Sequence, residues 1–337
     1  MRVMEVREAG APLVLAEREI SEPGPGEVRI EVAACGICHS DAFVKYAGYP
    51  GLELPRVPGH EVAGTIDAVG EGVSVWKIGD RVGVGWHGGH CFQCQACRRG
   101  HFINCANAKI TGISHDGGYG EYMISPWEAV ARLPDDIDFV NAGPLLCAGV
   151  TTYNSLRNSG ARPGDTVAIQ GIGGLGHLAV QYAHKMGFRT VALSRGADKE
   201  ALARELGASA YIDTEAQRSG KALAALGGAD LILATAPNAA AISALPAGLK
   251  PRGKLMLVAA PQGKLEVSAV RLLSGKQIHG WSSGTAVDSE DTLEFSVLAD
   301  VRPRIETFPL EQANEAFELM MTNKARFRAV LTIAERS

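Results

Sequence analysis

Hydrophobic and polar positions follow different patterns in the two parts of the chain. From Met1 to about Ile66, short apolar runs are broken by glycine and proline, and Val28–Val32 alternates apolar and polar residues. Such alternation is typical of a β-strand with one buried face. Further turn-and-strand patterns cover 57–70 and 77–82. We therefore predict an all-β, barrel-like N-terminal domain.

After Gly149 the pattern becomes a succession of strands and helices. Thr166–Gln170 is a largely apolar run suited to a buried parallel strand, and an amphipathic helical pattern follows it through about Met186. This succession predicts an α/β domain built on a doubly wound parallel sheet. The later predicted elements are strands at 190–194, 211–213, 230–234, 254–259 and 276–281 and helices at 198–206 and 239–249.

In the C-terminal tail we predict one helix, Glu311–Thr322, and a closing strand, Phe327–Ile333. A nucleotide-binding sheet that is already complete leaves this tail free to return to the first domain. The predicted domains are therefore 1–148 with 284–337, and 149–283.

Composition and charge narrow the classes of partner. The chain has 337 residues, 46% of them hydrophobic and 21% charged, as expected for a soluble protein of two domains. The net charge of −4 and the lack of a basic block argue against nucleic acid or an anionic membrane as partner, so a small molecule is expected. The N-terminus lacks a signal-peptide pattern, and we expect a cytoplasmic protein.

Four of the seven cysteines follow a spacing that favours a metal site. They stand as C-x2-C-x2-C-x7-C at Cys91, Cys94, Cys97 and Cys105, in a lobe (91–105) with little apolar material. Cysteines at short regular spacing in a reducing compartment are more often metal ligands than disulfides. Four thiolates close a tetrahedral zinc site, so we predict a structural zinc.

A glycine-rich segment lies between the strand Thr166–Gln170 and the helix after it. It has the pattern G-x-G-x-x-G, which in this context predicts a dinucleotide-binding turn, although a merely glycine-rich turn is the alternative. The first glycine permits the tight turn, the second lets a pyrophosphate approach, and the third permits close packing of helix on strand. The expected coenzyme contacts are Gly171, Gly173, Gly174, Leu175 and Gly176.

The remaining cysteines are Cys35, Cys38 and Cys147. Cys35 and Cys38 belong to Cys35–Asp41, which places two thiols, an imidazole, a hydroxyl and a carboxylate in seven residues. A polar turn with buried thiols is one interpretation. A catalytic zinc needs about three protein ligands, which Cys38, His60 and Cys147 could supply, but spacing does not show that they converge.

Several motifs together resemble one family, the zinc-dependent alcohol dehydrogenases of the medium-chain dehydrogenase/reductase group, over essentially the whole chain. The resemblance implies a GroES-like catalytic domain, a Rossmann nucleotide-binding domain and two zinc ions per chain. The matching motifs are Cys38–Asp41, Gly59–Glu61, the four-cysteine lobe, Leu146–Thr151 and Gly171–Gly176.

The resemblance also implies roles for individual residues. Cys38, His60 and Cys147 would hold the catalytic zinc, a Lewis acid for the alcohol or carbonyl oxygen, with Glu61 behind it. Asp41 would accept a hydrogen bond from His60 and fix its tautomer, with a simple helix cap as the alternative.

His39 matches a position that contacts the coenzyme pyrophosphate, and Ser40 matches the hydroxyl that takes the substrate proton; a solvated histidine and a capping serine are the alternatives. Many relatives carry a proton-relaying histidine where this chain has Phe43, which cannot transfer a proton. We expect release to end at water or at another group near Ser40.

Tyr49 and Trp86 match large residues of the family's substrate pocket. An aromatic wall favours apolar primary alcohols, aromatic or aliphatic, and their aldehydes, although ordinary core packing is the alternative for either residue. A polyol or sugar dehydrogenase is the rival substrate class, and a zinc-free, quinone-reductase-like or structural protein is the rival from another class.

The second strand of the nucleotide domain bears on the coenzyme. It ends at Ser194 and Arg195 without the carboxylate that usually binds the ribose hydroxyls of NAD, and Lys199 follows. A guanidinium suits a 2′-phosphate, which predicts NADP, with NAD as the alternative should Asp198 reach the ribose.

Strands near 254–281 end at a sheet edge, so we expect a homodimer or homotetramer.

Overall fold

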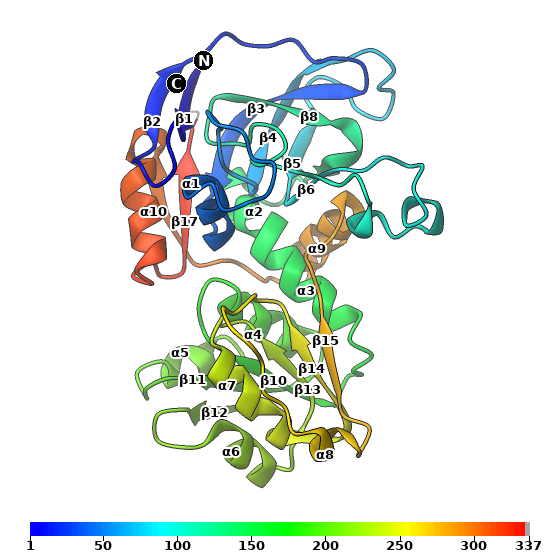
Figure 1. Cartoon of the computed structure of the whole chain (residues 1–337), viewed down its shortest axis with the longest axis vertical. Helices are drawn as coiled ribbons and strands as arrows, with labels where there is room; N and C mark the ends of the chain where they lie inside the picture. Colours follow the sequence, from blue (N-terminus) through cyan, green and yellow to red (C-terminus); the bar gives the residue numbers. More distant parts are fainter. Residues whose placement is uncertain (334–337) are drawn as a thin grey trace. The chain divides into compact units, whose positions relative to one another are not determined.

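The computed structural model describes residues 1–333, which form two compact units (Figure 1). One unit comprises Met1–Val150 and the segment that begins at Gly284, and the other comprises Thr151–Ser283. The predicted domain limits were 148 and 283. No helix among residues 1–333 is both long and apolar enough to cross a membrane.

The first unit is built around strand β3 (Glu27–Gly36), whose residues alternate between fully and partly buried positions along most of its length. It pairs antiparallel with β4 (Val62–Val69), β8 (Tyr122–Pro126) and β17 (Arg328–Thr332). The seven-stranded sheet has the order β16-β17-β3-β4-β5-β9, with β8 beside β3. This agrees with the predicted β-rich domain.

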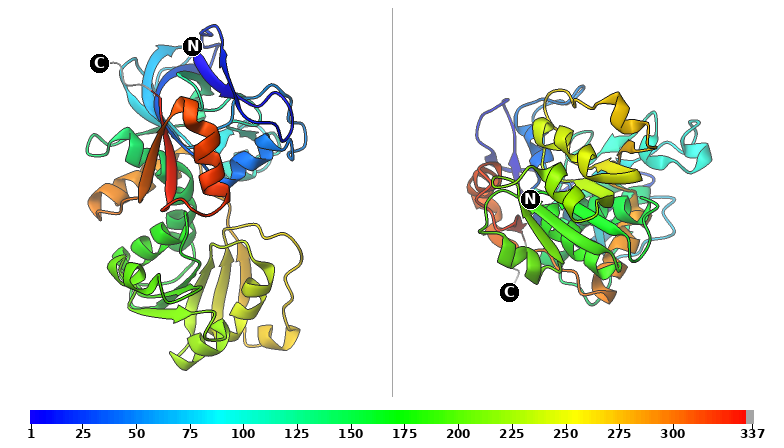
Figure 2. Two further views of the ribbon diagram at one scale, coloured as in Figure 1. Left: turned by 90° about the vertical axis from the view of Figure 1, so that its left-hand side faces the viewer. Right: turned by 90° about the horizontal axis from the view of Figure 1, so that it is seen from below.

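Segments from both ends of the chain belong to this first unit. Helix α10 (Ala313–Met321) packs on β17, so the C-terminal segment lies among strands from the first 150 residues (Figure 2). The segment that begins at Gly284 thus belongs to the same unit as the first 150 residues. The other elements of the unit are β1 (Arg2–Glu5), β2 (Val14–Glu17), α1 (Ala42–Lys45), β5 (Arg81–Val84), β6 (His87–Gly89), β7 (Lys109–Ile110), β9 (Val130–Arg132), α2 (Phe139–Pro144) and β16 (Ile305–Pro309).

The tail contains a second helix, α9 (Ala286–Leu298), so the prediction of a single helix there was wrong. The apolar pattern is weak because several hydroxyls are buried and bond to the helix backbone, as Ser296 Oγ does to Thr292 O (2.6 Å). The start signal was present, since Asp288 accepts hydrogen bonds from the backbone N–H (2.8 Å) and hydroxyl (3.0 Å) of Thr285. The buried residues on its inner face are Ser289, Thr292, Leu293 and Ser296.

The second unit contains a six-stranded parallel sheet in the order β12-β11-β10-β13-β14-β15. This order, with the first strand of the unit in the middle, is that of the doubly wound nucleotide-binding fold. All five residues of β10 are buried, which explains its largely apolar sequence. The elements are α3 (Val150–Arg157), β10 (Thr166–Gln170), α4 (Gly176–Lys185), β11 (Arg189–Ser194), α5 (Glu200–Glu205), β12 (Ala210–Asp213), α6 (Ser219–Ala225), β13 (Ala229–Ala234), α7 (Ala239–Ala244), β14 (Leu249–Leu257), α8 (Ala269–Leu272) and β15 (Gln277–Gly280).

Candidate active site

Four predicted site residues converge in the first unit. Ligand atoms of Cys38, His60, Glu61 and Cys147 all lie within 4.8 Å of one another. Cys38 follows β3, His60 and Glu61 immediately precede β4, and Cys147 lies in a π-helical turn that follows α2. The pairing of β3 with β4 thus places two of the three turns side by side. Single-turn π-helices often occur at functional sites.

The two thiols of this cluster are spaced as zinc ligands would be. Cys38 Sγ and Cys147 Sγ are 3.9 Å apart, and both residues are buried. Tetrahedral zinc with bonds of about 2.3 Å separates two thiolates by about 3.8 Å. The hydrogen bond with Cys147 is the main cause that lowers the pKa of Cys38, and the neighbouring His60 lowers it further. The same hydrogen bond, together with burial, raises the pKa of Cys147. The two sulfur atoms thus lie at the separation that two thiolates on one metal cation require.

His60 presents one ring nitrogen to the cluster. Its Nδ1 lies 3.1 Å from Asp41 Oδ1, which holds the proton on that nitrogen. Its Nε2 is buried and has no hydrogen-bond partner among residues 1–333. An unpaired buried nitrogen beside two thiols fits a metal ligand, and zinc commonly binds two thiolates and one imidazole. The Asp41 contact expected from the sequence is present.

Glu61 is fully buried and faces a cation that sequence reasoning missed. Arg328 donates hydrogen bonds to Glu61 Oε1 and to the carbonyl oxygen of Ile37 (3.0 Å). Burial raises the pKa of Glu61 to about 7, against the opposing charge of Arg328. The available signal was a lone arginine at the start of the otherwise apolar strand β17.

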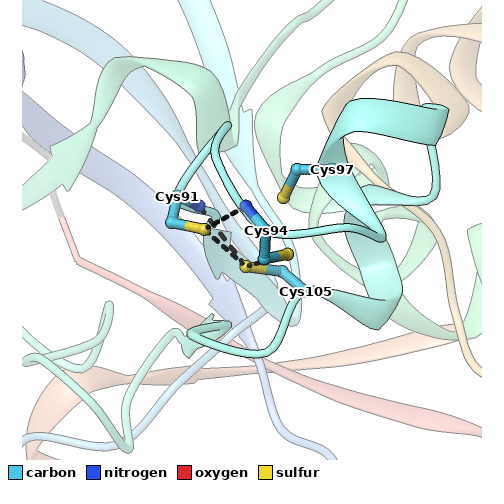
Figure 3. A group of neighbouring side chains, drawn as sticks. All are labelled: Cys91, Cys94, Cys97 and Cys105. Carbon is cyan, nitrogen blue, oxygen red and sulfur yellow. Dashed lines mark hydrogen bonds between the residues drawn. The ribbon is translucent and has the colours of Figure 1, made fainter.

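The four cysteines of the 91–105 lobe form a second cluster, with ligand atoms within 4.8 Å of one another. Figure 3 shows all four side chains directed toward a common centre. Cys105 Sγ lies 3.5 Å from Cys91 Sγ and 3.9 Å from Cys94 Sγ. Backbone N–H groups of Gln93 and Cys94 lower the pKa of Cys91 to about 6, which favours the thiolate that binds zinc.

The other predicted residues near Cys38 have separate positions. His39 is exposed and Ser40 half-buried, both in the 3-10 turn His39–Asp41. The Trp86 ring meets the His60 ring edge to face at 4.9 Å between centroids, so Trp86 borders the cluster. Tyr49 contacts Phe43 instead, with ring centroids 6.0 Å apart. Cys35 is fully buried and lies outside both clusters.

The glycine-rich turn of the second unit joins β10 to α4, with Gly174 and Leu175 immediately before the helix. Gly171 has a φ of +95°. A Cβ on Gly176 would lie 1.8 Å from the Gly171 carbonyl oxygen, whereas a Cβ on Gly173 would meet nothing within 4 Å. Tight packing at one glycine and open space at another are compatible with a nucleotide-binding turn.

The end of β11 carries the residues expected to choose the coenzyme. Ser194 is buried, Arg195 is exposed, and Lys199 immediately precedes α5. The loop between them is held by Asp213, whose Oδ1 accepts a hydrogen bond from Gly196 N at 2.9 Å. Sequence reasoning missed this anchor, although Asp213 ends the neighbouring strand β12.

Comparisons with known proteins agree with this geometry. The model of the alcohol dehydrogenase GroES-like domain matches residues 24–135, and that of the zinc-binding dehydrogenase matches 174–297. An alcohol dehydrogenase of Penicillium expansum is 48% identical over 97% of this chain and 96% of its own. One from Geobacillus stearothermophilus is 39% identical over 99% and 100%. The solved cinnamyl alcohol dehydrogenase of Sorghum bicolor matches with TM-score 0.90 and 33% identity, over 98% of this chain and 97% of its own.

The chain belongs to the zinc-binding alcohol dehydrogenase family. The resemblance noted in the sequence is confirmed, and so is the fold of a GroES-like domain with a Rossmann domain. This dehydrogenase is a zinc-dependent oxidoreductase that acts on alcohols. Zinc fits both donor clusters described above, since each offers thiolates at metal-ligand distances.

The buried pair of Glu61 and Arg328 gives a stability prediction for the dehydrogenase. Arg328→Met leaves the Glu61 carboxylate buried without its cation, and we expect the free energy of unfolding to fall by about 3–5 kcal/mol. Removing both charges, with Glu61→Gln added, should restore most of this loss. Urea unfolding of the single and double variants measures it. Arg326→Met, at an exposed arginine next to the same strand, is the control; an equal loss there would contradict the prediction.

Proposed function

We propose that the dehydrogenase reversibly oxidises primary alcohols, aromatic or aliphatic, to aldehydes by hydride transfer to NADP. The observation that carries this proposal is the convergence of Cys38, His60 and Cys147 on one buried point next to Trp86. The aromatic ring offers an apolar surface to the substrate, which disfavours polyols. The cinnamyl alcohol dehydrogenase of Sorghum bicolor acts, by its name, on an alcohol of this type.

In this proposal the catalytic zinc is held by Cys38, His60 and Cys147, and a structural zinc is held by the four cysteines of 91–105. Zinc bound at the first cluster supplies Lewis-acid polarisation of the alcohol or carbonyl oxygen. Glu61 lies behind the ligands as a buried carboxylate that tunes the local field. The catalytic domain comprises 1–148 and 284–337, and the coenzyme domain comprises 149–283.

The protein's own side chains then manage the proton. Ser40, half-buried in the turn after Cys38, takes the proton that the alcohol loses, and His39 contacts the coenzyme pyrophosphate. Phe43 is 43% exposed and has no group that could carry a proton onward, so release passes from Ser40 to water. Asp41 keeps the His60 proton on Nδ1, which leaves Nε2 free to bind. In this proposal Trp86 lines the alcohol side of the site, and Tyr49, beside Phe43, extends the same apolar wall.

These roles predict the zinc content and the activity of the wild type and of two variants. The purified protein should contain two zinc atoms per chain, one for each cluster, and should oxidise benzyl alcohol faster than sorbitol. Cys147→Ser should lose about one zinc per chain together with the activity. Ser40→Ala should keep both zinc atoms and turn over about 10²–10⁴-fold more slowly, because it lacks the proton acceptor.

Metal analysis and steady-state rates on the same preparations measure these outcomes. Ser125→Ala, at a buried serine of β8 in the same unit, is the control for loss of a hydroxyl. Faster turnover of sorbitol would contradict the substrate class. One zinc per chain in the wild type, or full turnover in Ser40→Ala, would contradict the proposed roles.

We propose NADP as the preferred coenzyme, because β11 ends at Ser194 without a carboxylate and the loop after it offers a cation. Arg195 is exposed there, with Lys199 close behind in sequence. The nearby Asp213 is engaged by the backbone N–H groups of Gly196 and Glu215, both at 2.9 Å. A 2′-phosphate at this loop would meet the Arg195 guanidinium, whereas the exposed Asp198 is the carboxylate that would favour NAD.

Arg195→Ala tests this preference. We expect the kcat/KM for NADP to fall by about 10- to 100-fold, the value of a charge-assisted hydrogen bond, while that for NAD stays nearly unchanged. Arg218→Ala, at another exposed arginine of the second unit, should alter neither. A wild-type enzyme that clearly prefers NAD would refute the proposal.

We also propose that the enzyme is a homodimer or homotetramer that pairs through β15. This strand is an edge of the six-stranded sheet, and all four of its residues are exposed. Apolar side chains lie near it: Ile278 is 37%, Val270 75% and Leu273 85% exposed. An apolar sheet edge of this kind favours pairing with a second copy.

Light scattering should therefore give a native mass of two or four chains, and Ile278→Lys with Leu273→Lys should shift it toward one. Leu298→Lys, at an equally exposed leucine of the first unit, should leave it unchanged. A wild type with the mass of one chain would contradict the proposal.

We place the enzyme in the cytoplasm, since its seven unpaired cysteines suit reducing conditions, and cell fractionation tests this.

A further inference from the structure

The Asp41 carboxylate behind His60 is saturated with hydrogen bonds. Its Oδ1 lies 3.2 Å from Gly59 N and 3.1 Å from His60 Nδ1. Its Oδ2 accepts from Cys38 N at 2.8 Å and from the Tyr119 hydroxyl at 3.0 Å. Three of these donors belong to the turns that carry the proposed ligands. Tyr119 is the fourth, and it comes from a separate part of the chain.

The ring of Tyr119 packs against the turn that contains Gly59 and His60. Tyr119 is fully buried, and a Cβ on Gly59 would lie 2.4 Å from its Cδ1 atom. Gly59 has a φ of +105°, so this turn depends on glycine both for its conformation and for the approach of the ring. The ring thus packs directly against the residue before His60.

Backbone hydrogen bonds join the segment before Tyr119 to the turn before His60. The N–H groups of Gly117, Gly118 and Tyr119 donate to the carbonyl oxygens of residues 57, 59 and 58, at 2.8, 3.0 and 3.0 Å. A Cβ on Gly117 would lie 2.2 Å from the Gly59 carbonyl oxygen. The two segments are therefore in close contact along their whole length, which fixes where the Tyr119 hydroxyl lies.

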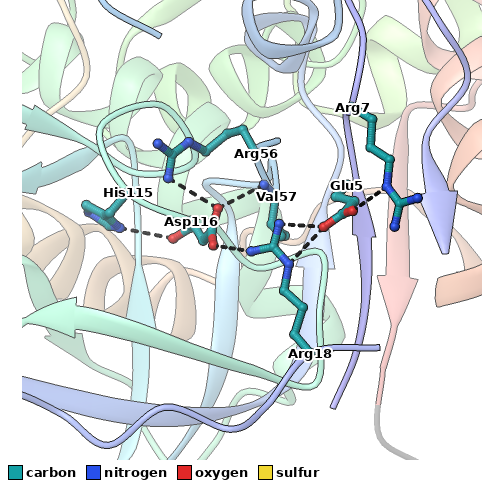
Figure 4. Close-up of polar contacts among 7 residues, drawn as sticks. All are labelled: Glu5, Arg7, Arg18, Arg56, Val57, His115 and Asp116. Carbon is teal, nitrogen blue, oxygen red and sulfur yellow. Dashed lines mark hydrogen bonds and ion pairs between the residues drawn. The ribbon is translucent and has the colours of Figure 1, made fainter. Parts of the chain in front are cut away.

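Asp116 anchors the other end of this segment (Figure 4). Its carboxylate accepts hydrogen bonds from Arg18 Nη1 at 2.7 Å, Arg56 Nη1 at 3.2 Å and Val57 N at 3.0 Å. Arg18 in turn pairs with the buried Glu5 of β1. The Asp116 carboxylate thus fixes the start of the segment 116–119, and the Tyr119 hydroxyl at its end donates to the Asp41 carboxylate.

We propose that Tyr119 is a positioning residue for the zinc ligand His60 and acts through Asp41. The hydroxyl fixes one carboxylate oxygen, so that the other faces His60 Nδ1 and keeps Nε2 directed at the metal. This inference rests on the proposed ligand set of Cys38, His60 and Cys147. Its rival is that Tyr119 only fills space, in which case phenylalanine would serve equally well.

The test is the rate at which zinc leaves the catalytic cluster for a chromogenic chelator. Tyr119→Phe keeps the ring and removes the hydroxyl. Loss of a group that directly orients a metal ligand costs about 10- to 100-fold in metal affinity. The Tyr119 hydroxyl contacts Asp41 rather than His60 itself, so we expect a smaller effect, with zinc release about 5- to 10-fold faster in Tyr119→Phe. Tyr122→Phe, three residues along the chain, is the control and should release zinc as the wild type does. Unchanged release in Tyr119→Phe would overturn the proposal.

A double-mutant cycle with Asp41→Asn separates positioning from packing. If Tyr119 acts through Asp41, adding Tyr119→Phe to Asp41→Asn should accelerate zinc release no further. Full additivity of the two changes would overturn the proposal. Should Tyr119→Phe fail to fold, Asp116→Asn takes its place, with the same expectation of faster release that disappears in the Asp41→Asn background.

Cys147→Ser identifies which phase of zinc release belongs to the catalytic cluster. If Cys147→Ser keeps both zinc atoms with wild-type release, the proposed ligand set fails. If Cys147→Ser loses one zinc atom and one phase of release, while Tyr119→Phe releases zinc as the wild type does, the ligand set stands and only the role of Tyr119 fails.

Discussion

The pairing of β3 with β4 and β17 is the constraint on which the candidate active site depends. Cys35 lies opposite Val62 on one side and opposite Leu331 on the other. This register places the turn after β3, the turn before β4 and the start of β17 together, and with them the side chains of Cys38, His60 and Arg328. A shift of one residue would turn every side chain of β3 to the opposite face and separate the donors.

The site also depends on charges that are buried in compensating sets. Asp41, His60, Glu61 and Arg328 are each at most 4% exposed, and each charge has a partner. Removing charges from water is costly, so such groups persist only where hydrogen bonds and opposite charges offset the loss. Here the offsets come from neighbours in space: Tyr119 and two backbone N–H groups for Asp41, and Arg328 for Glu61. The donors are thereby held in place before a metal binds.

Sequence reasoning performed best where the signal was local. Strand β10 was predicted at its observed limits because all five of its residues are buried and its centre, Val167–Ile169, is apolar. The four cysteines of 91–105 were recognisable because short spacings bring thiols to one centre without help from the rest of the fold. Helix α9 was missed because it buries hydroxyls that bond to their own helix, and its capping residues Thr285 and Asp288 are a weaker signal than a hydrophobic stripe.

The sequence by itself determined the two-part architecture, the four-cysteine lobe and the glycine-rich turn, since each is set by residues close together in the chain. Only the tertiary structure decided that Cys38, His60 and Cys147 meet, and that Arg328 and Tyr119 stand behind them. These groups are separated by 22 to 290 residues, and β-sheet pairing rather than local propensity brings them together. A buried tyrosine hydroxyl or arginine looks the same in sequence whether it fills space or holds a ligand, because the distinction lies in the partner it reaches across the fold.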